Sequence, residues 1–271
     1  MDHSSGFKRI VLPLPQSAQD YVSVAFAAEL ADLMGLDLLG VFAEDDRLKD
    51  LAVLPCVREL RLPGEGWHRL DAQQLERGLS LLAAEARRHF REAAKALHVG
   101  VRFDLAKGQI GETVFAQSMA DDIIAIVEPA NPAERMTHQF RQLLNATIDA
   151  AASALVIPSR ISRRKGPVVV VASGEGDPSI QIGLRVAQAV HEGLIVLAAT
   201  GADEAPSAPL TAAVPVQRRP IRTSEIGLAE LGSLLAFTGE RLVVLSRGTS
   251  ADFASKLAFE RGVPVLVPGR G

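Results

Sequence analysis

The sequence predicts an α/β protein of two tandem, doubly wound domains, each with a five-stranded parallel sheet in the strand order 3-2-1-4-5. The first observation is a repeat, because residues 10–42 align with residues 168–200 without a single insertion. The second is that strand-sized apolar segments alternate with helical segments in both copies. The third is composition: 48% hydrophobic but only 4% aromatic residues, typical of buried Val- and Ile-rich strands under Ala-rich helices. We place the domains at residues 7–160 and 166–271.

The first copy opens with an apolar strand at residues 10–14. Ser17 and Asp20 form a capping pair that starts a helix, which runs to Met34 and ends at Gly35. A second strand covers residues 36–42, and the acidic and Pro/Gly-containing stretch up to residue 70 is expected to be a loop. A long amphipathic helix then starts at Asp71 and ends near His98. The later strands and helices are expected at residues 99–105, 111–119, 123–127, 137–152 and 155–157.

The third strand decides the topology, since it reads as an edge strand in both copies. Val101, Phe103 and Leu105 are expected to point inward, and the matching segment at residues 214–222 contains Pro220 between arginines, which a central strand does not tolerate. With right-handed crossovers, this edge position gives the order 3-2-1-4-5. The second copy is shorter in its middle and lacks the long helix. Its later elements are expected at residues 225–237, 242–245, 251–261 and 263–267.

Composition excludes several classes of protein. The formal net charge of -3 gives no electrostatic reason to expect nucleic acid, and the basic run at residues 162–166 reads as a solvated linker. No apolar run approaches the roughly 20 residues that cross a bilayer. The polar N-terminal residues do not resemble a secretory signal, so we expect a cytoplasmic protein. Cys56, the one cysteine, is interpreted as a small hydrophobic residue rather than a redox centre.

Four features together resemble the universal stress protein family: a first strand that ends in a small polar turn, Lys107–Glu112 opening a helix, the strand Asp122–Ile126, and the closing strand Val265–Pro268. The resemblance covers nearly the whole chain as a tandem pair. It implies the five-stranded fold described above, of the adenine nucleotide alpha hydrolase-like type. Many members of the family bind an adenine nucleotide and others do not, so the resemblance alone does not decide whether this chain binds one.

The first copy lacks the residues with which such members hold a nucleotide. Members of the family that bind a nucleotide have Asp-Gly-Ser at the end of strand one. After strand four they have a Gly-x2-Gly-x9-Gly loop followed by Ser or Thr. Here residues 15–17 read Pro-Gln-Ser, and strand four is followed by Glu128, with no glycine in residues 128–132. We expect no nucleotide in the first copy.

The second copy keeps a weaker version of this site. Ser173 and Gly174 end its first strand, and the sequence Arg247-Gly248-Thr249-Ser250 follows its fourth strand, where it could donate hydrogen bonds to an anion or to ATP. The next glycine, Gly262, is expected to cap a helix. Glu175 and Asp177 would repel phosphate, and the simpler interpretation is that Asp177 caps the helix that begins at Pro178.

Other clusters of charged residues have both a functional and a structural interpretation. Arg135, His138 and Arg141 could hold an anion or simply be a solvated helix start. The loop Glu44-Asp45-Asp46 could attract a hard cation or be an ordinary acidic loop. His191 suits a helix C-terminus, and Trp67 could anchor its loop or a partner. No nucleophile elbow, Walker loop or metal-binding motif is present, so we expect neither catalytic nor metal-binding residues.

These observations favour a non-catalytic stress-response protein that acts through protein contacts and has no cofactor. We expect the two domains to pair through their fifth strands within one chain, imitating a dimer, with homo-oligomers as a further option and no membrane or nucleic-acid partner. The alternative is an adenine-nucleotide sensor that uses the second domain only, through Ser173, Gly174 and residues 247–250. An ATP-hydrolysing enzyme is a third hypothesis, for which no general base is visible.

Overall fold

The computed structural model describes residues 6–14, 21–44, 46–61, 66–95, 97–199, 213–221 and 226–270. The first half contains β1 (Arg9–Pro13), α1 (Tyr21–Met34), β2 (Asp37–Glu44), α2 (Asp46–Val53), β3 (Arg58–Arg61), β4 (Gly66–Arg69), α3 (Ala72–Ala94), β5 (Val101–Lys107), α4 (Ile110–Gln117), β6 (Asp122–Val127), α5 (Pro132–Arg135), α6 (His138–Ile148) and β7 (Ser153–Ile157). The second half contains β8 (Val168–Ala172), α7 (Pro178–Ala189), β9 (Leu194–Ala199), β10 (Val216–Ile221), α8 (Leu228–Leu235), β11 (Leu242–Leu245), α9 (Ala251–Arg261) and β12 (Val265–Val267).

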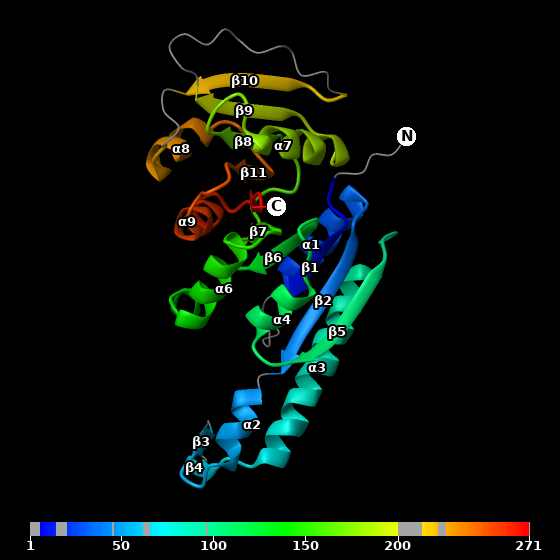
Figure 1. Ribbon diagram of the computed structural model, residues 1–271, viewed down its shortest axis with the longest axis vertical. Coiled ribbons are helices and arrows are strands. Elements are labelled where there is room, and N and C mark those ends of the chain that lie inside the picture. Colours follow the sequence, from blue (N-terminus) through cyan, green and yellow to red (C-terminus); the bar gives the residue numbers. More distant parts are fainter. Residues whose placement is uncertain are drawn as a thin grey trace.

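One ten-stranded sheet runs through the molecule in the order β10-β9-β8-β11-β12-β7-β6-β1-β2-β5 (Figure 1). From either outer edge inward, the strands of each half come third, second, first, fourth and fifth along the chain, leaving aside the separate β3-β4 pair. The two expected sheets are therefore the two halves of a single sheet. They meet where β12 pairs with β7, with Leu266 opposite Leu155. This pairing is antiparallel, whereas all other neighbours in the sheet are parallel.

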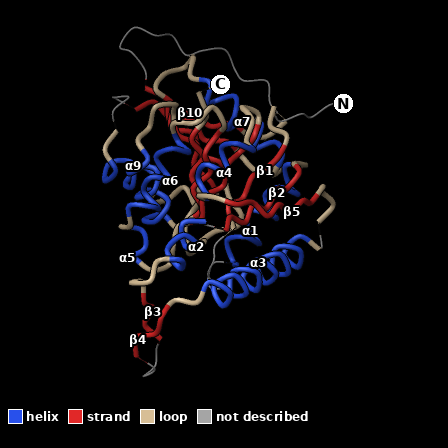
Figure 2. Tube along the Cα trace, turned by 60° about the horizontal axis from the view of Figure 1, so that its bottom comes forward, coloured by secondary structure: helices blue, strands red, loops and turns tan. Residues whose placement is uncertain are grey.

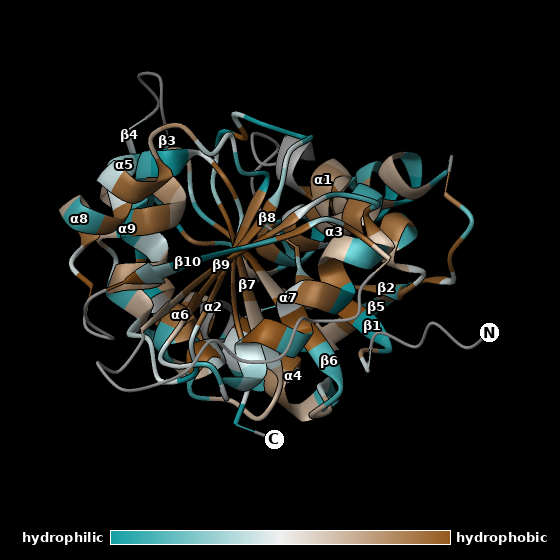
Figure 3. Ribbon diagram, turned by 90° about the horizontal axis from the view of Figure 1, so that it is seen from above, coloured by the Kyte–Doolittle hydropathy of each residue, from teal (hydrophilic) through white to brown (hydrophobic). Residues whose placement is uncertain are grey.

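Helices cover both faces of the sheet. On one face α1 contacts α3 and α7, and on the other α6 contacts α4 and α9, with α8 beside α9. Figure 3 shows the hydrophobic strands in the centre, with helices on either side whose outer faces are more polar. The core follows the same division, because one cluster of buried side chains includes Phe26, Phe90 and Leu184 and another includes Leu144, Leu231 and Leu257.

The expected loop between β2 and α3 was wrong. Residues 46–53 form α2, and residues 58–61 and 66–69 form the antiparallel hairpin β3-β4, with Leu60 opposite Trp67. The hairpin extends away from the rest of the molecule (Figure 2). The error has a physical reason: short exposed strands rich in charged residues lack the alternating pattern that identifies a half-buried strand.

The inward-pointing side chains expected on β5 were only partly right. Phe103 is half-buried, and its ring lies 6.2 Å from that of Phe90 on α3. Val101 and Leu105 are exposed, because β5 is the outermost strand of its half and lacks a strand on its far side. The helix from Asp71 is observed with Asp71 as its N-cap. The proposed capping pair Ser17 and Asp20 lies outside the described residues.

Candidate functional site

The antiparallel junction decides where the two candidate sites lie. In an open α/β sheet, ligands bind at the carboxyl ends of the strands where the order reverses. Those strands are β1 and β6 in the first half and β8 and β11 in the second. Since β7 and β12 run in opposite directions, the two sets of carboxyl ends lie at opposite edges of the sheet. The halves therefore cannot share one crevice.

The structure brings most of the predicted second-half site together. Ser173, Arg247, Gly248, Thr249 and Ser250 line one cavity of about 350 Å³ at the ends of β8 and β11. Gly248 has a φ of +88°, which permits the tight turn before α9. The sixth predicted residue, Gly174, does not line this cavity, although it is adjacent to Ser173 in the chain.

Most hydroxyl protons of this site already have acceptors inside the protein. The Ser173 hydroxyl donates to the Asp177 carboxylate at 2.8 Å, and the Thr249 hydroxyl donates to the Ser246 carbonyl at 2.8 Å. The Ser250 hydroxyl oxygen accepts from the Phe253 N–H at 3.3 Å as the N-cap of α9. Each hydroxyl has a single proton. An anion bound here would have to displace the bonds that Ser173 and Thr249 make.

The start of α7, where a phosphate could bind to the helix N-terminus, is occupied by the protein's own Asp177. Its carboxylate accepts from the Ser179 N–H at 2.9 Å and from the Ser173 N–H at 2.9 Å, so the expected N-cap is confirmed. Burial by itself would raise the pKa of Asp177, but the hydrogen bonds from Ser173 and Ser179 outweigh it and lower the pKa to about 2. The carboxylate is therefore ionised at neutral pH and repels a second anion. Glu175, in the same loop, is paired with Arg218 of β10.

The first-half crevice contains Glu128, which directly follows β6. Its N–H donates to the Ile157 carbonyl at 2.8 Å, and its side chain is completely buried. One carboxyl oxygen accepts a hydrogen bond from the Ser255 hydroxyl of α9, and the other, Oε2, has no partner among the described residues. Burial raises the pKa of Glu128 to about 7. A buried carboxyl group thus stands where a nucleotide phosphate would be expected. Residues 15–17, the other part of this crevice, lie outside the described residues.

The predicted cluster of Arg135, His138 and Arg141 is divided by the structure. Arg135 and Arg141 line a cavity of about 500 Å³ between α5, α6 and α9, whereas His138 does not. The Arg135 guanidinium lies over the ring of Phe259, 3.8 Å from its centre. Sequence reasoning missed Ser255 and Phe259 as members of this cluster, because they come from the other half of the chain.

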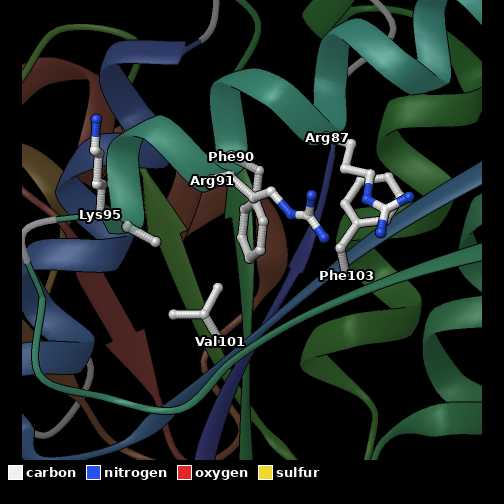
Figure 4. Close-up of a pocket in the computed structure, with 7 residues that line it drawn as sticks. Arg87, Phe90, Arg91, Lys95, Val101 and Phe103 are labelled. Atoms are coloured by element: carbon white, nitrogen blue, oxygen red, sulfur yellow. The ribbon is translucent and has the colours of Figure 1, made fainter.

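A second basic groove was also missed, between α3 and β5. It has a volume of about 290 Å³ and is lined by Arg87, Arg91 and Lys95 together with Phe90 and Phe103 (Figure 4). The spacing of the three cations, one turn of helix apart, was the available signal. All three side chains are exposed, so this groove has the character of a solvated helix face.

The structure also shows the surroundings of the other residues that the sequence analysis named. Cys56 is a free, exposed cysteine. Within the described part of the chain, no group of three potential ligands could hold a metal ion, and Asp45 of the acidic loop lies outside that part. Trp67 is 65% exposed. The linker is largely solvated, since Ser162, Arg164 and Lys165 are exposed. Arg163 lies 3.8 Å from the buried Glu240. None of the described helices has the length and apolarity of a membrane span.

The fold is that of universal stress proteins. A universal stress protein from Archaeoglobus fulgidus DSM 4304 superposes with a TM-score of 0.64 and 12% identity, over 99% of each chain. A protein of unknown function from Pseudomonas aeruginosa PAO1 gives a TM-score of 0.51 and 14% identity, over 98% of this chain and 94% of the other. A protein from Pseudomonas aeruginosa UCBPP-PA14 that is assigned to the universal stress proteins gives 0.51 and 15%, with the same coverage. The sequence matches no family model and no curated protein.

Proposed function

We propose that this chain is a cytoplasmic, non-catalytic regulatory protein of the universal stress type, which acts through contacts with other proteins. The observation that carries this proposal is the occupation of both phosphate positions by carboxyl groups of the protein. Asp177 takes the Ser179 N–H at the start of α7, and Glu128 is buried at the end of β6. A triphosphate would meet negative charge or an unsolvated carboxyl group in either half.

The hairpin β3-β4 is the surface proposed for protein contact. Leu60 and Trp67 are opposite each other, 50% and 65% exposed, and residues two apart share a face of a strand. Arg58 and Arg69, also paired and exposed, therefore flank them on the same face. An aromatic and aliphatic pair beside two arginines is the composition of a protein-binding hot spot.

A binding experiment tests the non-nucleotide part of the proposal. Isothermal titration calorimetry of the full chain with ATP and with ADP at millimolar concentrations is expected to give no heat of binding. A multiple-turnover phosphate-release assay is expected to show no hydrolysis above the buffer blank. Saturable binding of ATP together with phosphate release would contradict it.

A matched pair of variants tests the protein-contact part. Trp67→Ala is expected to abolish recovery of the proteins that associate with the full chain in cells. Phe237→Ala, which removes an aromatic ring that is 100% exposed elsewhere on the surface, is expected to leave recovery unchanged. Equal recovery with both variants would show that the hairpin is not the contact surface.

A nucleotide sensor that uses the second half remains the second candidate, favoured by the single cavity that Ser173 and residues 247–250 line. Its affinity for ATP would depend on the Arg247 guanidinium, so Arg247→Ala should weaken ATP binding by about tenfold or more. The absence of heat with ATP for both the wild type and the variant would eliminate this candidate.

A further inference from the structure

The cavity of about 500 Å³ lies over the junction of the two halves, between α5 and α6 of the first and α9 of the second. Helices α6 and α9 are in contact on the same face of the sheet (Figure 1). Because each runs antiparallel to its own strands, and β7 and β12 run in opposite directions, the two helices also run in opposite directions. One wall of the cavity belongs to the first half and the other to the second, so the cavity exists only when both halves are present.

The lining combines an apolar body with excess positive charge. Met136, Phe140, Leu144 and Phe259 supply much of the apolar surface. Met136 is 69% exposed and Phe259 52% exposed, so the apolar rim is open to solvent. This surface is suited to a flat apolar group, since planar rings stack well on aromatic and thioether side chains.

Three cations and one carboxylate line the same cavity. Lys256 is paired with Asp252 at 2.8 Å, one helical turn away. Arg135 and Arg141 form no ion pair among the described side chains, although Arg135 lies close enough to the buried Glu128 to act on the pKa of that carboxyl group. A guanidinium group presents several N–H donors in a plane that matches a carboxylate. The charge of the cavity therefore favours an anion.

A buried donor without a partner lies on the lining of the cavity. Arg135 Nε is buried without a hydrogen bond among the described residues. Buried polar atoms rarely lack partners. An unpartnered N–H donor beside a cavity is the expected signature of an empty subsite for an acceptor.

We propose that the junction cavity binds a small organic anion with a flat aromatic body and a single carboxylate. The carboxylate would lie against Arg135 and Arg141, and the ring would lie between Met136, Phe140 and Phe259. The volume falls within the range of about 300–1,000 Å³ that is usual for small-molecule sites. This inference goes beyond the proposed function, because it gives a regulatory protein a ligand to sense at the boundary between its halves.

The test uses the full chain, 1-naphthoate as the probe and 1-naphthalenemethanol as its uncharged counterpart, with binding measured by calorimetry. Naphthoate is expected to bind at least about tenfold more tightly than the alcohol, because charged hydrogen bonds contribute more than neutral ones. Arg141→Gln is expected to weaken naphthoate binding by about tenfold. The matched control Arg88→Gln, which removes an arginine on the exposed face of α3, is expected to leave it unchanged.

Three results would overturn the proposal: no binding of naphthoate at millimolar concentration, equal affinity for the acid and the alcohol, or equal affinity of the Arg141→Gln and Arg88→Gln proteins. Met136→Glu provides a second variant in case Arg141→Gln fails to fold, since Met136 is mostly exposed. Its carboxylate should repel the probe and lower the affinity by a similar factor. Failure of this test would leave the ATP and Trp67 experiments unaffected, because they concern other residues.

Discussion

At the scale of single residues, two carboxyl groups near strand ends have pKa values that are shifted in opposite directions. Asp177 accepts hydrogen bonds from backbone and hydroxyl donors, and these lower its pKa to about 2 in spite of burial. Glu128 is buried with one hydroxyl donor, and burial raises its pKa to about 7. The number of donors around each group, rather than its position at a strand end, therefore determines its charge near neutral pH.

Glu128 should make the stability of the protein fall as pH rises. Below pH 4.5, the ordinary pKa of a glutamate side chain, Glu128 is protonated in both the folded and the unfolded chain. Between pH 4.5 and about 7 the unfolded chain releases the proton first, so the free energy of unfolding falls, by at most roughly 3 kcal/mol, and then levels off. Glu128→Gln should abolish this loss, so that it is more stable than the wild type at pH 8 but not at pH 4.5. Urea unfolding at both values measures this, and an equal difference at both would contradict it.

Asp177 should stabilise the start of α7. Asp177→Ala removes the bonds to the Ser173 and Ser179 N–H groups, and we expect a loss of about 1–2 kcal/mol in the free energy of unfolding at pH 7. Because the folded pKa is lowered, the charge-dependent part of this contribution is present above pH 3.8 and is lost as pH falls through about 2. Urea unfolding is the measurement. Asp252→Ala, which breaks an exposed pair with Lys256, is the control and should cost only a few tenths of a kcal/mol.

At the scale of elements, close helix–sheet packing depends on a glycine. A Cβ atom at Gly183 of α7 would lie 2.1 Å from a methyl group of Val170 on β8. The helix therefore rests directly on the strand at this point. In α8, by contrast, a Cβ atom at Gly232 would meet nothing within 4 Å.

The two glycines should therefore respond in opposite ways to the same substitution. Gly183→Ala should destabilise the protein by about 1–3 kcal/mol, because α7 must move away from β8. Gly232→Ala should stabilise it by roughly 0.5–1 kcal/mol, since alanine is the better helix former and no atom obstructs it. Thermal unfolding followed by circular dichroism compares the two. A shift of the same sign in both variants would contradict this account of the packing.

Elements with clear caps could be predicted from the sequence, and short exposed strands could not. The helix expected at residues 251–261 is α9, with Ser250 as its N-cap and Gly262, at a φ of +62°, as its left-handed C-cap. The charged hairpin β3-β4 gave no such signal. The contact between Glu128 and Ser255 was also invisible in the sequence, because it depends on how the halves are joined. For this reason the second-half loop could be assigned to a site, whereas the junction cavity could not.

At the scale of the whole molecule, the core does not respect the boundary of the sequence repeat. One cluster of buried side chains includes Leu155 and Leu266, which are also opposite each other where β7 pairs with β12. The cluster on the other face contains Leu144 and Val156 together with Leu257. Each cluster is therefore built from both halves, and neither half can unfold without exposing apolar surface of the other.

We therefore predict that the full chain unfolds in one calorimetric transition, with a calorimetric enthalpy close to the van't Hoff enthalpy. Leu266→Asp, which places a charge in the buried centre of β12, should lower the temperature of this single transition by several degrees, because the lost burial destabilises both halves together. Scanning calorimetry of the wild type and the variant measures the number of transitions and their temperatures. Two separate transitions, or an early transition in the variant that leaves the first half folded, would show that the halves are energetically independent in spite of their continuous sheet.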